Sequence, residues 1–460
     1  MLKQRGSLFG TDGARGIANG DLPPELALAI GRALGQWLGE QTPRPRVLLA
    51  ADTRVSGPML SAAVVAGLCS TGAQVLDCGV LPTPGLLLLV RAQEAAGGVV
   101  ISASHNAPAF NGIKLVGPGG VKLPDDTERA LEQLVFAEED LSPRPTGGEV
   151  GSVTYARRAD REYLDLLTHY LPPGLNLGCL PVVLDCTWGA AWLVAPEGFR
   201  RASAEVTALH AEPRGDQINE GSGSLHPEVV AQAVVDRGAA LGVAFDGDAD
   251  RAMFVDETGV VRDGDFIKYV LASDLHARNM LNPPVVVGTV MSNLGLELAL
   301  RERGISLVRA AVGDRYVMKE MRRSGAPLGG EQSGHLIFSD LMVGDGLYSA
   351  LRVAEVLART GAPLSELCAP VCKVPQMLLN IPVRDRHGWE DSPGLQAELT
   401  RWQERLGAEG RILIRPSGTE PLVRVMVEAV DHDLAVSCSE TLARIVADEF
   451  GYGELLSETG

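Results

Sequence analysis

The sequence has no Cys-x-x-Cys pair and no long apolar run. Its seven cysteines are scattered, and Cys368 and Cys372 have no second pair to complete a metal site. We therefore expect reduced thiols, as in a cytosolic protein. Apolar runs such as Leu86–Val90 are far shorter than the roughly 20 residues that span a bilayer. Residues Met1–Arg5 carry no apolar signal core, so we expect a cytoplasmic protein that contacts no membrane.

An excess of basic residues is also missing. The chain has 41 Lys and Arg against 58 Asp and Glu, which gives a formal net charge of −17. Without a broad basic field, nonspecific binding to nucleic acid is not expected. A local group of arginines in so acidic a chain would instead indicate a site for a small anionic molecule.

At 460 residues, the chain exceeds the roughly 250 to 300 residues that one compact core accommodates. Strand-like and helix-like segments alternate along most of it, which indicates βαβ units around mixed, largely parallel sheets. The last part has the pattern of a smaller α+β domain. We therefore predict an α/β protein with three related α/β domains, at residues 1–150, 151–255 and 256–370, and a C-terminal α+β domain at 371–460.

The first informative loop contains Ser104 and follows the strand-like segment 98–102. In open α/β sheets, functional groups lie in loops beyond the carboxyl ends of strands. His105 is adjacent and Lys114 lies ten residues further on, so Ser104 could be a nucleophile with basic help. Taken alone, the loop is better explained by a turn whose side chains satisfy local backbone groups.

The second loop places Asp246, Asp248 and Asp250 directly after the apolar segment 241–245. Three carboxylates this close do not stay ionised together without a cation. Ligands that are all oxygen favour Mg²⁺, Ca²⁺ or Mn²⁺. An EF-hand is rejected because Arg251 takes the position of its glycine and the segment lies between strands. A phosphatase of the haloacid dehalogenase type, with the first Asp as nucleophile, remains open at this point.

Two further loops offer groups that bind a ligand. The glycine-rich loop 329–335 contains Glu331 and Ser333, which can bind hydroxyls, although a tight turn explains it equally well. The loop 415–421 combines a guanidinium fork, hydroxyls and an exposed backbone N–H, as a phosphate requires. Its donors are Arg415, Ser417, Gly418 and Thr419, with Arg424 just beyond.

In this order, and with Phe9–Gly16 ahead of them, the four loops resemble those of the α-D-phosphohexomutase superfamily, from Phe9 to Val427. Residues 330–335, 415–421 and 313–317 look most like the phosphoglucosamine mutase branch. The phosphomannomutase/phosphoglucomutase branch usually has Met at the position of Gln332. The resemblance implies four domains around a central cleft.

The resemblance also implies a role for each matching residue. Ser104 would be the phosphoserine that donates and re-accepts a phosphoryl group. One Mg²⁺ per active site would be held by Asp246, Asp248, Asp250 and a phosphate oxygen on Ser104. The implied catalytic set is Ser104, His105, Lys114, Arg251 and His335, and the implied substrate-binding set is Arg15, Glu331, Ser333, Arg415, Ser417, Gly418, Thr419 and Arg424.

The activity implied is that of an isomerase-class phosphotransferase. It would convert glucosamine 6-phosphate into glucosamine 1-phosphate through a 1,6-bisphosphate, on the route to UDP-N-acetylglucosamine. A phosphomannomutase/phosphoglucomutase is the alternative within the superfamily. A dehalogenase-type phosphatase leaves Ser104 and the Arg415 loop without a role, and a noncatalytic binding protein makes the three aspartates redundant. The partner expected is a small phosphosugar, and a homodimer is left open.

Three positions depart from the usual family pattern. Residues 107–110 replace a proline that normally comes directly after the asparagine of the serine loop. Trp188 stands where an asparagine is more usual, and Ala311 replaces a lysine. The residues expected to carry the chemistry of the serine loop are intact.

Overall fold

The computed structural model describes residues 8–10, 12–137, 142–385, 387–417 and 420–451. The chain divides into two compact units. The first comprises Met1–Thr289 and Ala310–Cys368, and the second comprises Val290–Arg309 and Ala369–Gly460. Among the described residues, no helix is long and apolar enough to cross a membrane.

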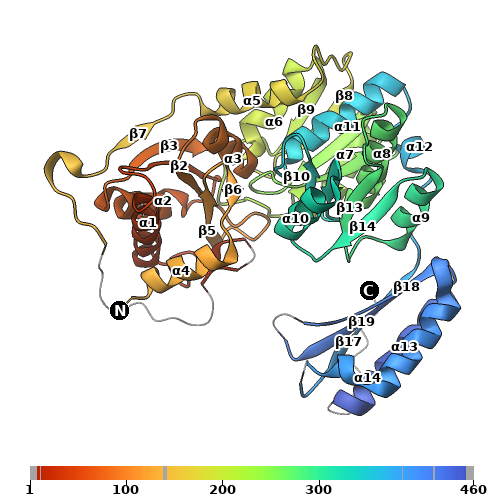
Figure 1. Ribbon diagram of the computed structural model, residues 1–460. Coiled ribbons are helices and arrows are strands. Elements are labelled where there is room, and N and C mark those ends of the chain that lie inside the picture. The colour runs from red at the N-terminus through yellow and green to blue at the C-terminus, as the bar shows by residue number, and fades with distance from the viewer. Residues whose placement is uncertain (1–7, 11, 138–141, 386, 418–419, 452–460) are drawn as a thin grey trace. The chain divides into compact units, whose positions relative to one another are not determined.

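The first unit begins with a seven-stranded mixed sheet in the order β1-β5-β4-β2-β3-β7, with β6 paired to β5. Strands β4, β2, β3 and β7 are parallel, whereas β5 runs antiparallel to β4. Ile30, Leu34 and Val64 pack against Val47 and Val99 of the sheet. The strands are β1 (Ala14–Ile17), β2 (Arg46–Ala51), β3 (Gln74–Val80), β4 (Gly97–Ile101), β5 (Phe110–Gly117), β6 (Val121–Lys122) and β7 (Val153–Tyr155), and the helices are α1 (Pro24–Gly39), α2 (Gly57–Ser70), α3 (Thr83–Ala92) and α4 (Asp125–Val135) (Figure 1).

A second sheet has the order β12-β11-β10-β8-β9. Every residue of β10 is buried, as expected of a central strand covered on both faces. Because β10 pairs antiparallel with β11, the segment between them is a tight connection at one sheet edge. The elements here are α5 (Ala159–Tyr170), β8 (Pro181–Asp185), α6 (Ala191–Arg201), β9 (Glu205–Leu209), α7 (Glu228–Arg237), β10 (Leu241–Phe245), β11 (Ala252–Asp256) and β12 (Val261–Arg262).

A third sheet has the order β14-β13-β15-β16, and β14 spans Ser306–Ala310. β13 pairs in parallel with β15, and β15 pairs antiparallel with β16. Helix α11 begins at Gly346, where the side chain of Asp345 accepts the N–H of Tyr348 as an N-cap. The elements are α8 (Gly264–Ala277), β13 (Val285–Thr289), α10 (Asp314–Ser324), β15 (Leu328–Gly330), β16 (Leu336–Phe338), α11 (Gly346–Thr360) and α12 (Leu364–Cys368).

The second unit is built on the antiparallel sheet β17-β19-β18. Val423, Val425 and Val427 alternate along β19 and are buried in a core shared with the two helices α13 and α14 (Figure 1). Glu428 follows Val427 on β19, and its buried carboxylate accepts a hydrogen bond from the backbone N–H of Leu294. The segment Val290–Arg309 belongs to this unit. Its elements are α9 (Leu294–Glu302), β17 (Gln376–Pro382), α13 (Pro393–Leu406), β18 (Gly410–Pro416), β19 (Leu422–Ala429) and α14 (His432–Phe450).

The predicted α/β class with mixed sheets and a C-terminal α+β domain is confirmed. The grouping of Val290–Arg309 with the C-terminal residues could not be read from local patterns, because it depends on contacts more than 100 positions apart in the sequence. The four domain boundaries stay predictions.

Candidate active site

Ser104 lies in the loop that follows β4, and it is fully buried. Its Oγ donates a hydrogen bond to Asp246 Oδ2 at 2.6 Å and lies 3.3 Å from Nδ1 of His105. The backbone of Ser104 is left-handed, with φ of +52°. This conformation costs a non-glycine residue roughly 1–2 kcal/mol and persists where the surroundings impose it, often at functional sites.

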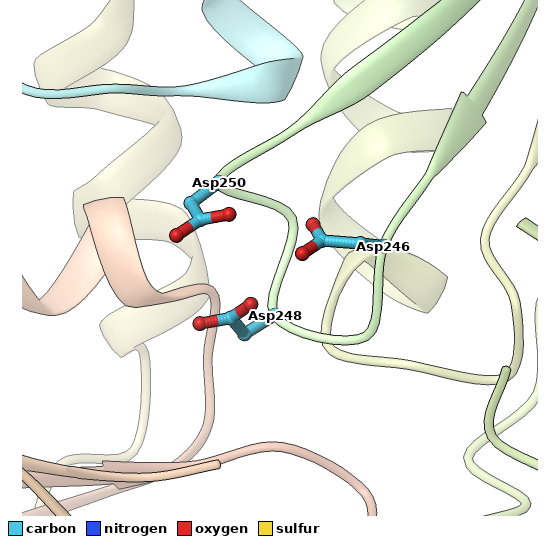
Figure 2. Close-up of side chains that lie close together, drawn as sticks. All are labelled: Asp246, Asp248 and Asp250. Atoms are coloured by element: carbon cyan, nitrogen blue, oxygen red, sulfur yellow. The ribbon is translucent and has the colours of Figure 1, made fainter. Parts of the chain in front are cut away.

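The three aspartates of the β10–β11 connection converge on one point. Asp246, Asp248 and Asp250 are buried, and one oxygen of each lies within 4.8 Å of the others (Figure 2). Asp248 Oδ1 and Asp250 Oδ1 have no hydrogen-bond partner among the described residues. Burial, together with the charges of Asp250 and Asp248, raises the pKa of Asp246 well above its usual value. The set therefore fits a divalent cation, which would take up the free oxygens and offset the repulsion.

Lys114 of β5 lies beside the aspartates. Its Nζ donates to Asp248 Oδ2 at 2.7 Å and lies 2.9 Å from Asp12 Oδ2. Burial alone would lower the pKa of Lys114, but the charges of Asp12 and Asp248 outweigh it and raise that pKa above its usual value. The side chain is therefore an ammonium cation, suited to balance negative charge on a bound phosphate.

A cavity of about 460 Å³ opens in front of these groups. Both acidic and basic side chains line this cavity. Among the described residues, Nε of Arg15 and Nε of Arg251 have no hydrogen-bond partner. Burial would lower the pKa of His335, but Asp250 and Asp314 raise it to about 9. The charged and imidazole residues in the lining are Asp12, Arg15, His105, Lys122, Asp250, Arg251, Asp314, Glu331 and His335.

The structure thus brings most of the predicted residues of the first unit together, with one exception. Ser104, Lys114, Arg251 and His335 lie around the aspartates, as the contacts of Arg251 with His105 at 3.2 Å and with Asp250 at 3.7 Å illustrate. Ser333 is exposed and does not line the cavity. Its predicted contact with a sugar hydroxyl therefore has no support from this geometry.

Three residues at the site were not singled out by the sequence interpretation. Asp12 accepts from Lys122 Nζ at 2.6 Å, and the same Nζ lies 2.8 Å from Asp314 Oδ2. Thr83 donates its hydroxyl to Asp248. Asp12 lies within the N-terminal motif that carried the resemblance, so that motif was a usable signal. No sequence signal pointed to Lys122, because its two partners are 110 or more positions away in the sequence.

The predicted phosphate-binding residues belong to the second unit. Arg415 and Arg424 are direct cross-strand neighbours on β18 and β19, and Ser417 is buried at the end of β18. Burial and the charge of Arg424 lower the pKa of Arg415. Nε of Arg424 has no partner among the described residues, so two like charges stand side by side with donor capacity for an anion. Gly418 and Thr419 lie outside the described residues.

Four family models match the chain in sequence order. They are described as phosphoglucomutase/phosphomannomutase alpha/beta/alpha domains I, II and III and C-terminal domain, at residues 6–142, 161–259, 263–374 and 378–445. A phosphoglucosamine mutase of Syntrophomonas wolfei is 48% identical over 93% of this chain and 96% of its own length. One of Desulforudis audaxviator is 49% identical over 96% and 98%. The chain belongs to the phosphoglucomutase/phosphomannomutase family.

Solved structures agree with this membership. A phosphoglucomutase/phosphomannomutase family protein from Burkholderia thailandensis superposes with a TM-score of 0.79 at 26% identity, over 96% of this mutase and 97% of that chain. An Aspergillus fumigatus N-acetylphosphoglucosamine mutase, solved with GlcNAc-6P and magnesium, gives a TM-score of 0.62 at 18% identity over 96% and 95%, which shows a shared fold. The resemblance to the phosphohexomutases is confirmed, and with it the isomerase class of the enzyme.

Proposed function

We propose that this mutase interconverts glucosamine 6-phosphate and glucosamine 1-phosphate and that Ser104 carries the phosphoryl group between them. One observation carries the proposal: a buried serine hydroxyl lies 2.6 Å from the first of three clustered aspartates at the edge of a charged cavity. The names of the relatives at 48% and 49% identity support glucosamine phosphate as the substrate.

Asp246, Asp248 and Asp250 would hold Mg²⁺ together with a phosphate oxygen on Ser104. When bound, the ion would neutralise charge on the oxygens of the phosphoryl group in transfer. The Oδ1 atoms of Asp248 and Asp250, which accept no hydrogen bond among the described residues, support these residues as the ligands. Lys114 and Arg251 add two fixed positive charges next to the same group, so most of the catalysis is positioning and electrostatic stabilisation.

The first transfer breaks the P–Oγ bond of phosphorylated Ser104 and forms a P–O bond to O1 of the 6-phosphosugar. The proton of the O1 hydroxyl leaves with a basic group, and Ser104 Oγ ends as a hydroxyl. The reverse reaction at O6 of the bisphosphate restores phosphoserine and releases the 1-phosphate. His335 lines the cavity and lies 3.7 Å from Asp250, so it is placed to move a proton in one direction.

The reacting and the resting phosphate exchange places between the two transfers. The enzyme therefore needs a second phosphate-binding group that tolerates either end of the sugar bisphosphate. Arg415, Ser417 and Arg424, together with Gly418 and Thr419, are proposed for that role, and the paired guanidinium groups support it. Glu331, whose Oε1 already accepts the N–H of Gly313 at 2.9 Å, is proposed to bind sugar hydroxyls.

The proposal is tested by comparing kcat/KM on glucosamine, glucose and mannose 6-phosphates, with a sugar 1,6-bisphosphate primer and Mg²⁺. We expect the glucosamine substrate to be turned over at least about 10-fold faster, because each well-placed polar contact contributes about that factor. Faster turnover of glucose or mannose phosphate would reassign the enzyme to the phosphoglucomutase/phosphomannomutase activities.

The role of Ser104 is tested with Ser104→Ala. We expect no mutase turnover by this variant. Its Mg²⁺ affinity should stay within a few-fold of that of the unphosphorylated wild-type enzyme, because the three aspartates are unchanged. In a dehalogenase-type phosphatase the serine would be dispensable, and Asp246→Ala would cause the largest loss. Mutase activity in Ser104→Ala would therefore contradict the proposed phosphoserine.

A further inference from the structure

Arg54 is a buried arginine that lies directly behind the serine loop, in the segment after β2. Strand β2 pairs in parallel with β4, so the carboxyl ends of these two strands lie together at the same sheet edge. Arg54 does not line the charged cavity and has none of its surface exposed. It therefore contacts the loop without being placed to contact a substrate.

The guanidinium group of Arg54 donates four hydrogen bonds to this loop and one to Asp52. Nη1 donates to the carbonyl oxygens of Ala107 at 2.6 Å and Phe110 at 2.9 Å. Nη2 donates to those of Ser104 at 3.0 Å and Asn106 at 2.7 Å. Nε donates to Asp52 Oδ2 at 2.9 Å. All five N–H donors of an arginine are used, and four of them fix backbone carbonyls within seven consecutive residues.

The carboxylate of Asp52 extends this set of hydrogen bonds to the N–H side of the loop. Its Oδ2 also accepts the hydroxyl of Ser102 at 2.6 Å, and Ser102 Oγ accepts the backbone N–H of Ser104 at 3.0 Å. Both sides of the Ser104 backbone are thus tied to the Asp52–Arg54 ion pair. This arrangement explains how the left-handed conformation of Ser104 is held in place.

A side chain from the second sheet region holds the same carbonyls from the other side. Asn219 Nδ2 donates to Ser104 O at 2.8 Å and to Asn106 O at 2.9 Å. Each of these two carbonyls therefore accepts from Arg54 and from Asn219. The double contact links the serine loop to the part of the chain that carries the aspartates.

We propose that Arg54 is a positioning residue for phosphoryl transfer, which fixes the serine-loop backbone whether Ser104 is free or phosphorylated. The inference rests on the proposed function. In each cycle Ser104 gains and loses a group of about two negative charges, which pulls the loop toward nearby cations. Oγ must nevertheless stay in line with the aspartates, and a displacement of about 1 Å can cost about 100-fold in rate. Because Arg54 acts on the loop alone, its effect falls on kcat rather than on KM.

The test is Arg54→Lys in the full-length enzyme. A lysine has one ammonium group with three donors, so it cannot bind four carbonyls and Asp52 at once. Relative to wild type, we expect kcat per folded molecule to fall about 100-fold, with KM for glucosamine 6-phosphate within about 3-fold. The rate at which a sugar 1,6-bisphosphate phosphorylates Ser104, followed by mass spectrometry, should fall in parallel.

Arg352→Lys is the matched control. Arg352 is also a buried arginine and donates to Glu355 and Tyr348, but it bonds nothing in the serine loop and does not line the cavity. The control should lower the melting temperature and leave kcat per folded molecule unchanged. If Arg54→Lys behaves in the same way, Arg54 is merely structural and the inference is wrong.

A second variant keeps the test decisive if Arg54→Lys does not fold. Asn219→Ala removes one of the two donors to Ser104 O and Asn106 O, and we expect about a 10-fold loss of kcat with little change in KM. An unchanged kcat in this variant would overturn the inference. A wild-type enzyme inactive on glucosamine phosphates would instead overturn the proposed function, on which the inference rests.

Discussion

At the scale of one residue, Asp246 shows that a metal site can lower the free energy of unfolding when no cation is bound. It is buried between two like charges, and burial and these charges raise its pKa. The charge of Arg251 offsets part of this effect, as do the hydrogen bonds from Ser104 Oγ at 2.6 Å and from the backbone N–H of Arg251 at 3.1 Å. Charge of this kind is maintained for function and lowers stability when no cation is bound.

Asp246→Asn is therefore expected to change metal affinity and stability in opposite directions. The amide removes one negative charge and still accepts from Ser104, so the metal-free variant should be about 1–3 kcal/mol more stable than wild type. Mg²⁺ should bind at least about 100-fold more weakly. Calorimetric titration and thermal unfolding in EDTA measure the two effects. Unchanged Mg²⁺ affinity would exclude Asp246 as a ligand.

The buried carboxyl group of Asp345 should make the folding stability of the chain depend on pH. Burial raises its pKa to about 6, although Tyr348 N–H and Tyr163 OH each donate to it at 2.9 Å. The folded chain thus binds this proton more tightly than the unfolded chain, in which the pKa is about 3.9. Raising the pH from about 4 to 6 therefore costs stability through this group, up to about 3 kcal/mol.

We expect Asp345→Asn to remove this cost. An asparagine can still cap α11 and contact Tyr163, so the stability of the variant relative to wild type should rise between pH 4 and about 6 and stay constant above pH 7. Urea unfolding at several pH values measures the difference. Asp431→Asn, at the exposed N-cap of α14, controls for general effects of the substitution. A difference that does not vary with pH would contradict the prediction.

At the scale of elements, the loop after β4 and the β10–β11 connection approach each other closely because Gly247 has no side chain. A Cβ on Gly247, between the first two aspartates, would lie 2.6 Å from the carbonyl oxygen of Ser104. The β10–β11 connection could not then keep its present distance from the loop after β4. The hydrogen bond between Ser104 and Asp246 requires that distance.

Gly247→Ala should therefore separate the nucleophile from the metal ligands. We expect kcat to fall at least about 10-fold, since small displacements of reacting groups have large effects on rate. Gly39→Ala at the end of α1 is the control, because its Cβ would meet nothing within 4 Å, and it should be neutral or slightly stabilising. Equal kcat values for the two variants would show that the loops can move apart without consequence.

At the scale of the whole molecule, residues 290–309 are hydrogen-bonded to the C-terminal part of the chain around the buried carboxylate of Glu428. Glu428 accepts from Arg411 at 2.7 Å, from Asn293 Nδ2 at 3.3 Å and from the N–H of Leu294 at 3.0 Å. Arg411 in turn donates to the carbonyls of Val290 and Ser292. The second unit therefore includes a segment that ends 60 positions before the rest of the unit begins.

Glu428→Gln should weaken this unit and leave the first one unchanged. It leaves the partly buried Arg411 without its counter-charge, which we expect to cost up to about 3 kcal/mol. Hydrogen exchange should accelerate in α9, β18 and β19, while amides of the serine loop and of residues 246–250 keep their protection. Faster exchange in the aspartate loop would contradict the division into two units.

The sequence by itself determined the features that have a local signature. Apolar strands followed by Ser104 and by the three aspartates indicated an α/β protein with its chemistry at strand ends, because side-chain periodicity and ligand spacing are properties of neighbouring residues. The tertiary structure alone decided the rest. It assigned four loop carbonyls to Arg54, placed Lys122 between Asp12 and Asp314, and joined residues 290–309 to the C-terminal part. Such contacts connect positions up to about 190 residues apart, and nothing in the local pattern encodes which buried charge meets which partner.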